Sequence, residues 1–272
     1  MKISVIGAGS WGTAIVSILS KNNKVNWWVR RERLINQILL KKRNTKYLTS
    51  CKLNMKNITF YKDVDQIILH SDLIIIAVPS EFIFSIFETK GSLLNSKTVL
   101  STVKGVIPEK KTTPHDFFKS ISPNLNYGVI SGPCHAEEVA LEKQSYLTIS
   151  TNNSSIYPQI KKIFNTKFIN ISTSNDIIGT EYAAILKNIY AILIGISYGL
   201  GYGDNFIAVL TTSCANEMKR LLHSLDPKER TILQPAYLGD LLVTCYSPHS
   251  RNRSLGLLIG KGYSVENAIE KM

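Results

Sequence analysis

The sequence has few cysteines and no targeting segment. Its four cysteines, at positions 51, 134, 214 and 245, are widely spaced and form no Cys-x-x-Cys pair. Neither a zinc site nor a disulfide framework is therefore indicated. The first apolar stretch is short and ends at Gly7 without the features of a signal peptide. We expect a cytoplasmic protein with reduced thiols and no bound metal.

Acidic residues are also in short supply. The chain has 20 acidic and 32 basic residues, which gives a formal net charge of +12. A charge of this size can indicate nucleic-acid binding. Here the basic residues are scattered and are not gathered into stripes with aromatic residues, so we expect no nucleic-acid partner. An anionic small molecule accounts for the functional part of the charge equally well.

The chain also lacks a hydrophobic run suited to a membrane. Its most apolar long stretch, residues 182–200, contains Lys187 and Asn188. Burying that pair in lipid would be costly, so we expect a buried helix of a globular domain and no membrane span. A chain of 272 residues most naturally divides into two domains.

A glycine-rich motif is the most informative feature present. A short apolar run at the N-terminus leads directly into Gly-Ala-Gly-Ser-Trp-Gly at residues 7–12 and then into an apolar helix pattern. In a dinucleotide site, Gly7 would allow the turn off the strand, Gly9 would let backbone amides approach a pyrophosphate, and Gly12 would let the helix pack on the sheet. A second apolar strand, residues 25–29, follows at βαβ spacing. This context favours dinucleotide binding over a glycine turn kept for packing alone.

The end of the second predicted strand bears on the choice of cofactor. Enzymes that prefer NAD usually place Asp or Glu there, where the carboxylate binds the ribose hydroxyls. This chain has Arg30 and Arg31 instead, and two guanidinium groups suit the additional 2′-phosphate of NADP. The alternative is a solvated helix start that Glu32 partly neutralises. We expect NADP or NAD as the cofactor, with NADPH favoured.

The remaining pattern divides the chain into a sheet region and a helical region. After a basic, irregular segment at residues 41–57, predicted as a surface loop, apolar runs typical of buried parallel strands continue to about residue 172. From residue 176 onward the pattern is helical. We predict an α/β protein with an N-terminal doubly wound sheet of the Rossmann type. Residues 1–174 would form this dinucleotide-binding domain, and residues 175–272 an all-helical substrate domain.

Four further features suit the chemistry of ketone reduction, which requires a proton donor. Lys187 lies in the apolar helix among small alanines, where desolvation would lower its pKa into the range useful for proton transfer. The alternative is a lysine that reaches the surface. Lys104, at a predicted strand end, is a second cation, and Asp240 could orient a lysine or cap a helix. Ser250-Arg251-Asn252 suits a phosphate dianion.

Taken together, these motifs resemble the bacterial NAD(P)-dependent glycerol-3-phosphate dehydrogenases over the whole chain. The resemblance is carried by the glycine motif at residues 7–12, Val78-Pro79-Ser80, Val103-Lys104-Gly105, Ser131-Gly132-Pro133-Cys134-His135-Ala136-Glu137-Glu138, Leu186-Lys187-Asn188, Gly239-Asp240-Leu241 and Ser250-Arg251-Asn252. It implies an oxidoreductase that interconverts dihydroxyacetone phosphate and sn-glycerol 3-phosphate for phospholipid synthesis.

The resemblance also implies residue roles. Lys187 would be the proton donor and acceptor, assisted by Lys104 and Asp240. Cofactor contacts are implied for Ser10, Trp11, Arg30, Lys104, Ala136 and Arg251, in addition to those already predicted for Gly7, Gly9, Gly12 and Arg31. Substrate contacts are implied for Lys104, Gly132, Cys134, Lys187, Asp240, Ser250, Arg251 and Asn252.

Three departures from the family pattern stand out. Many relatives carry Ser or Thr at the position of Cys134. The segment at residues 234–240 lacks the usual glycines before Asp240, so we expect a stiffer or differently shaped loop there. Relatives continue past Met272 with further helices, so the helical domain is expected to be shortened.

Other interpretations stay open at this point. One is a 3-hydroxyacid dehydrogenase of similar architecture, and another is a nucleotide-binding remnant without turnover. A homodimer is a candidate assembly, with no other macromolecular partner expected.

Overall fold

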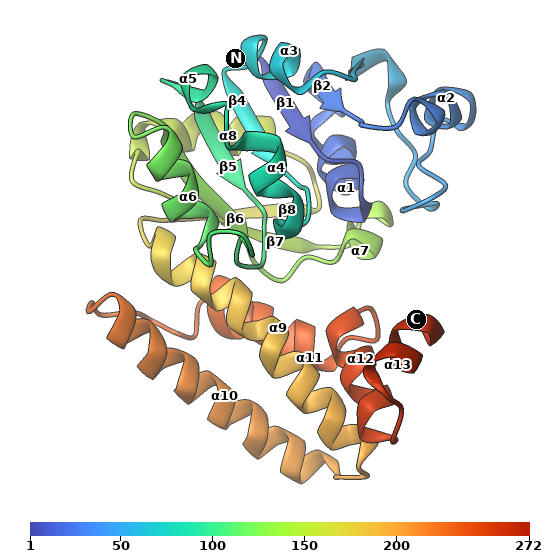
Figure 1. Cartoon of the computed structure of the whole chain (residues 1–272), viewed down its shortest axis with the longest axis vertical. Coiled ribbons are helices and arrows are strands. Elements are labelled where there is room, and N and C mark those ends of the chain that lie inside the picture. The colour runs from blue at the N-terminus through green and yellow to red at the C-terminus, as the bar shows by residue number, and fades with distance from the viewer. The chain divides into compact units, whose positions relative to one another are not determined.

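The chain forms two compact units. The computed structural model describes all residues from Met1 to Met272. The first unit comprises residues 1–130 and 134–177, and the second comprises residues 131–133 and 178–272. The first is a sheet with helices on its faces and the second is helical (Figure 1). No sequence pattern indicates that residues 131–133 belong with the helices.

The first unit is built on an eight-stranded sheet in the order β3-β2-β1-β4-β5-β6-β7-β8. The central strand β1 pairs in parallel with both β2 and β4. The chain first moves outward from β1 to β3 and then returns to β4, so the strand order reverses between β1 and β4. Ligands of open parallel sheets bind at this reversal. The strands are β1 (Ile3–Ile6), β2 (Val25–Trp28), β3 (Ile58–Tyr61), β4 (Leu73–Ile76), β5 (Thr98–Ser101), β6 (Asn126–Ser131), β7 (Ser145–Thr151) and β8 (Ile169–Ser174).

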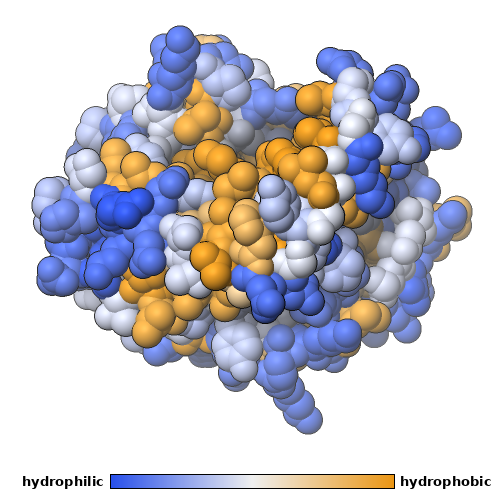
Figure 2. Space-filling model, turned by 90° about the horizontal axis from the view of Figure 1, so that it is seen from below, coloured by the Kyte–Doolittle hydropathy of each residue, from blue (hydrophilic) through white to orange (hydrophobic).

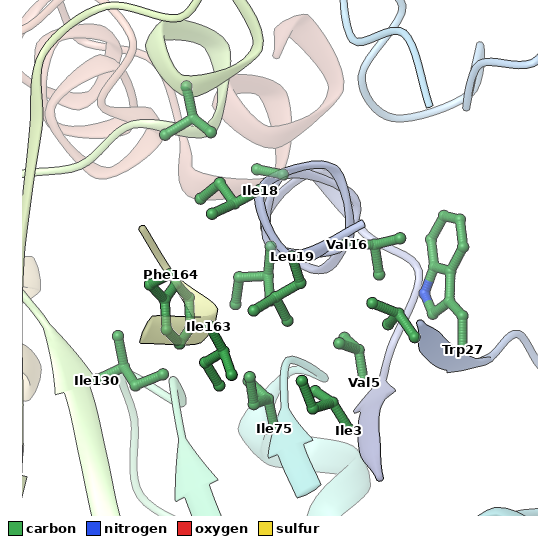
Figure 3. Packing of buried hydrophobic residues seen from close by; sticks show 14 of the residues in the cluster. Ile3, Val5, Val16, Ile18, Leu19, Trp27, Ile75, Ile130, Ile163 and Phe164 are labelled. Carbon is green, nitrogen blue, oxygen red and sulfur yellow. The ribbon is translucent and has the colours of Figure 1, made fainter. Parts of the chain in front are cut away.

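Two hydrophobic clusters cover the two faces of this sheet, because successive side chains of a strand point to opposite sides. Val5 and Ile75 belong to the cluster that includes helix α1, and Ile76 belongs to the other cluster. Figure 3 shows Leu19 of α1 above Val5 and Ile75. With both faces covered, the central strands are largely apolar, most clearly β4 with its run Leu73–Ile76, which is what made them recognisable in the sequence.

Eight helices surround the sheet. The sequence prediction did not include β3 or the short helices α3, α5, α6 and α8. The helices are α1 (Ser10–Leu19), α2 (Glu32–Lys41), α3 (Val64–Leu69), α4 (Ile83–Phe87), α5 (Gly91–Leu94), α6 (Pro114–Ile121), α7 (Ala136–Ala140) and α8 (Tyr157–Ile163), with 3₁₀ turns at Met55–Asn57, Ser80–Phe82 and Ser154–Ile156.

The basic segment at residues 41–57 differs in part from the predicted surface loop. Its lysines are exposed, but Asn44 and Leu48 are buried and form an isolated bridge with each other. Cys51 and Leu53 are buried as well. The segment packs against the sheet because it supplies apolar side chains to the cluster around α1. Its many basic residues gave no indication of this packing.

The helical unit contains two long helices and three shorter ones. α9 and α10 run in opposite directions and are joined by a short loop (Figure 1). Their buried side chains, together with Tyr237, Leu241 and Cys245, form a separate hydrophobic cluster. The helices are α9 (Ile177–Gly199), α10 (Asp204–Leu225), α11 (Asp240–Tyr246), α12 (Arg251–Gly260) and α13 (Val265–Lys271), with a π-helical turn at Pro235–Gly239.

α9 is the one helix whose length and composition would suffice to cross a membrane. Core helices of globular proteins pass the same test, and 56% of the most apolar window of α9 is buried inside the structure. It also contributes Ala183, Tyr190 and Ile194 to the hydrophobic cluster of its unit. We therefore interpret α9 as the central helix of this unit.

Two buried thiols of the helical unit are expected to resist alkylation. Burial raises the pKa of Cys214 to about 11 and that of Cys245 to about 12. A raised pKa keeps the thiol protonated, and at pH 8.5 two pKa units lower the reactive thiolate fraction about 100-fold. Iodoacetamide labelling followed by peptide mass spectrometry should give rates at least about 100-fold lower in the native protein than in urea. The half-buried Cys134 is an internal comparison, and equal native and unfolded rates for Cys214 and Cys245 would contradict this expectation.

Candidate active site

The glycine turn between β1 and α1 has the geometry of an anion site. Gly7 has a φ of +123°, which side chains disfavour, and an ideal Cβ there would lie 2.3 Å from the Ala77 carbonyl oxygen. Around Gly9, the N-cap of α1, no heavy atom lies within 4 Å of an ideal Cβ. No side chain caps the first amides of α1. Open space thus adjoins helix amides that can bind a pyrophosphate, so the turn fits a dinucleotide.

Two buried side chains brace this turn, and sequence reasoning missed both. Trp27 Nε1 donates a hydrogen bond to the Gly7 carbonyl oxygen at 2.8 Å. Asn44 Nδ2 donates to the Ala8 carbonyl oxygen at 2.9 Å and to Thr13 Oγ1 at 2.8 Å. Trp27 lies in an apolar strand and Asn44 in a basic segment. Neither pattern indicates a contact with the glycine turn.

The two arginines after β2 line a cavity beside the glycine turn. The cavity has a volume of about 190 Å³ and includes Arg30, Arg31 and the backbone of residues 7–9. The Arg30 guanidinium lies 5.5 Å from the ring centre of Phe82, another lining residue. Glu32, the expected neutralising group, forms an ion pair with Lys62. The arginine charges therefore remain available to an anionic ligand in this cavity.

Other predicted site residues of the first unit also follow strand ends. Lys104, three residues after β5, is half-buried, as is Cys134, and Ala136 is the buried first residue of α7. Since β1, β4 and β5 are parallel, the segment with Lys104 emerges at the same edge as the glycine turn. Trp11, in the first turn of α1, has a buried indole Nε1 with no hydrogen-bond partner in the protein, which a bound ligand could satisfy.

A buried ion pair lies in the helical unit. Lys187 Nζ donates to Asp240 Oδ1 at 2.5 Å, and the two side chains are only 5% and 2% exposed. The second carboxylate oxygen, Asp240 Oδ2, accepts a hydrogen bond from Ser131 Oγ at 3.2 Å. Sequence reasoning had missed Ser131, which lies 109 residues before Asp240. A lysine with a fixed carboxylate partner and no bulk water can hold or release one proton at a defined point.

The local structure explains why this pair can be buried. The neighbouring helical positions of Lys187 are Ala183, Ala184 and Ala191, all buried, and their small side chains leave room beside the ammonium group. Asp240 begins α11 directly after a π-helical turn, at the segment where a stiffer or differently shaped loop was expected. A carboxylate is favoured at a helix N-terminus, and single π-helical turns often occur at functional sites.

The tripeptide at residues 250–252 begins α12. Ser250 is the buried N-cap, and its Oγ accepts a hydrogen bond from the Arg253 amide at 3.3 Å. Arg251 and Asn252 line a cavity of about 360 Å³. α12 packs closely on α9, since an ideal Cβ on its Gly256 would lie 2.1 Å from a carbonyl oxygen of α9. The helix that carries Arg251 is thereby held against the helix that carries Lys187.

These features have complementary chemical roles. Reduction of a ketone by a nicotinamide needs a hydride from the dinucleotide and a proton from a separate acid. The first unit can hold a dinucleotide, and the second holds a buried lysine–carboxylate pair. This fold and these sites define a nicotinamide-dependent dehydrogenase with a helical second unit.

Comparison with known proteins specifies the family. Residues 2–157 match the family model for the NAD-dependent glycerol-3-phosphate dehydrogenase N-terminus, and residues 176–272 match the model for its C-terminus. The chain belongs to the NAD-dependent glycerol-3-phosphate dehydrogenase family.

Individual relatives agree with the family models. A glycerol-3-phosphate dehydrogenase of the NAD(P)+ type from Clostridium botulinum is 36% identical over 275 residues, which cover 100% of this chain and 82% of that protein. One from Bacillus pumilus is 38% identical, covering 100% of this chain and 80% of that protein. The crystal structure of glycerol-3-phosphate dehydrogenase from Coxiella burnetii matches with a TM-score of 0.92 at 30% identity, covering 99% of this chain and 83% of that one.

Proposed function

We propose that this protein interconverts dihydroxyacetone phosphate and sn-glycerol 3-phosphate with NADPH or NADH, and that it supplies glycerol 3-phosphate for phospholipid synthesis. The observation that carries the proposal is the buried Lys187–Asp240 pair in a chain that both family models match. The glycerol-3-phosphate dehydrogenases of Clostridium botulinum and Bacillus pumilus align over the whole chain. We assign residues 1–174 to a dinucleotide-binding domain and residues 175–272 to a substrate domain.

Lys187 is the proposed acid in the direction of reduction. When bound, the reduced nicotinamide supplies a hydride to the carbonyl carbon of the ketone. Lys187 Nζ delivers its proton to the carbonyl oxygen, which becomes the hydroxyl of the product. Asp240 stabilises the ammonium form before the transfer, and Ser131 fixes the carboxylate through its second oxygen. In the reverse direction the neutral amine of Lys187 accepts the hydroxyl proton.

The remaining proposed contacts hold the two ligands. Lys104 contacts both cofactor and substrate, and Gly132 and Cys134 contact the substrate. Ser250, Arg251 and Asn252 bind the phosphate dianion, for which a guanidinium and an amide are well suited. Cofactor contacts are assigned to Gly7, Gly9, Ser10, Trp11, Gly12, Arg30, Arg31, Ala136 and Arg251.

A steady-state assay tests this function. Purified protein should oxidise NADPH in the presence of dihydroxyacetone phosphate, as followed by the absorbance of the reduced nicotinamide. A 3-oxoacid should give no comparable rate, because it has no phosphate for Arg251 and Asn252. Turnover of the 3-oxoacid alone would assign the protein to the 3-hydroxyacid dehydrogenases. Cofactor binding in calorimetry without turnover of any ketose phosphate would identify a nucleotide-binding remnant.

The cofactor preference is expected to depend on Arg30. Its charge faces the cavity beside the glycine turn, and the nearby Glu32 is paired with Lys62. Arg30→Ala should lower kcat/KM for NADPH about tenfold or more and leave that for NADH nearly unchanged, because only NADPH carries the 2′-phosphate. Arg33→Ala is the matched control, since this exposed arginine of α2 does not line the cavity. An equal loss of kcat/KM with NADPH and NADH would argue against a contact between Arg30 and the 2′-phosphate.

We further propose that the protein is cytoplasmic and forms a homodimer. Figure 2 shows hydrophobic side chains at the surface between polar ones, and exposed apolar residues of the helical unit include Ile189, Leu193, Phe206 and Val209. Such side chains favour association. Light scattering coupled to gel filtration should give twice the 30.4 kDa chain mass, and a monomeric mass at assay concentrations would contradict the dimer.

A further inference from the structure

A large cavity of the first unit has no role in the proposed reaction. Its volume is about 610 Å³, within the range of small-molecule sites. It lies between the last part of α1, the segment that follows residue 50, and the end of α7. None of its lining residues lines the cavity beside the glycine turn. Ser17, on its wall, follows Gly9 by about 12 Å along the helix axis.

The walls of this cavity carry an excess of positive charge. Four lysines line it, together with one acidic residue, Glu142. Glu142 is already neutralised, because it forms an ion pair with Lys21. Lys42, Lys52 and Lys56 are exposed and take part in none of the ion pairs of the structure. Lysines gathered around one hollow repel each other, and an anion between them would relieve that repulsion.

The floor of the cavity is apolar. Cys51, Leu53, Val139 and Phe168 are all buried and belong to the hydrophobic cluster around α1. Burial raises the pKa of the Cys51 thiol, so the thiol stays protonated and the floor carries no charge. The Lys21 ammonium lies 5.2 Å from the centre of the Phe168 ring. This cation–π contact places one positive charge next to the apolar floor.

We propose that this cavity is a second anion site, which binds a small organic phosphate with an apolar or aromatic part. The phosphate contacts Lys42, Lys52 and Lys56, and the apolar part contacts the floor beside Met55 and Phe168. An inorganic anion alone would leave the apolar floor uncovered, and an uncharged apolar molecule would leave the lysines uncompensated. The combination of the two surfaces selects a ligand with both parts.

Methionine methyl groups provide a local probe of this site. The chain has four methionines, of which Met55 lines the cavity and Met218 is fully buried in the helical unit. Protein labelled with ¹³C at the methionine methyl groups is saturated with NADPH and titrated with phenyl phosphate. The Met55 signal, assigned with Met55→Leu, should shift and saturate, while the Met218 signal stays in place. Equal concentrations of inorganic phosphate or phenol should each shift Met55 less.

Charge reversal tests the lysines. Lys52→Glu/Lys56→Glu should weaken the apparent affinity for phenyl phosphate about tenfold or more, and added salt should weaken binding to the original protein. Lys161→Glu/Lys162→Glu is the matched control, because these exposed lysines of α8 lie outside the cavity; its affinity should be unchanged. The proposal is overturned if Met55 does not respond, if phosphate or phenol acts as strongly as phenyl phosphate, or if both double variants bind equally well.

Discussion

Lys187→Met is expected to lower kcat for dihydroxyacetone phosphate by about 10² to 10⁴-fold, which is the usual contribution of a positioned acid. Methionine has a similar length but no proton to give. The affinity for NADPH, measured by calorimetry, should stay close to that of the original protein, because the glycine turn and Arg30 belong to the first unit. Steady-state kinetics with NADPH gives kcat and KM separately.

The same substitution also has a structural effect that must be separated from the catalytic one. It leaves Asp240 buried without its cation, which should cost about 3 to 5 kcal/mol of unfolding free energy. The double variant Lys187→Met/Asp240→Asn lacks both charges. Its unfolding free energy, measured in urea, should therefore return most of the way to that of the original protein. The double variant should nevertheless remain inactive. If its kcat returned to that of the original protein, Lys187 would be a structural residue and the proposed mechanism would be wrong.

Alanine substitutions at two glycines of the same turn are expected to have different effects, one on stability and the other on cofactor affinity. An ideal Cβ on Gly12 would lie 2.3 Å from the Gly7 carbonyl oxygen, so Gly12→Ala must displace the turn. This overpacking should lower the unfolding free energy by about 1 to 3 kcal/mol or more. A Cβ on Gly9 meets nothing within 4 Å, so Gly9→Ala should fold normally. It should still weaken NADPH binding about tenfold or more, because the Cβ occupies space that the pyrophosphate needs.

Thermal unfolding and calorimetry together distinguish the two effects. Gly203→Ala is the control, since an ideal Cβ there also meets nothing within 4 Å and Gly203 belongs to the helical unit. It should change NADPH affinity little. A stable Gly12→Ala variant would contradict the close packing at Gly12. A Gly9→Ala variant with unchanged NADPH affinity would show that the turn does not hold the cofactor as proposed.

The fold could be predicted from the sequence where one local pattern determines the structure. The family and the α/β class with a helical second unit are confirmed by the family models and the solved relatives. The central parallel strands are largely apolar, and β4 is entirely so, which is why residues such as Ile74 and Ile75 mark it without further context. β3 is as short as β1 and β4 but is half-exposed, so no continuous run of buried aliphatic residues distinguishes it from a loop.

The sites show a second limit of sequence reasoning. Lys187 stands out because a charge in an apolar helix pattern is unusual. Its partner Asp240 was predicted as a group that could orient a lysine. Ser131 does not stand out in the sequence, because it meets Asp240 through tertiary packing alone. Asn44 lies in a segment whose lysines and arginine indicate only a surface loop, yet its side chain holds the glycine turn. Contacts between distant segments are set by the folded chain and have no local signature.

The buried indole that holds the glycine turn gives this protein a built-in optical reporter. All three tryptophans, Trp11, Trp27 and Trp28, lie in the first unit, and Trp27 is hydrogen-bonded to the turn itself. Intrinsic fluorescence therefore follows the first unit alone, while far-ultraviolet circular dichroism also follows the helices of the second unit, including the long α9 and α10. A single denaturation series observed with both signals measures whether the two units unfold together or one after the other.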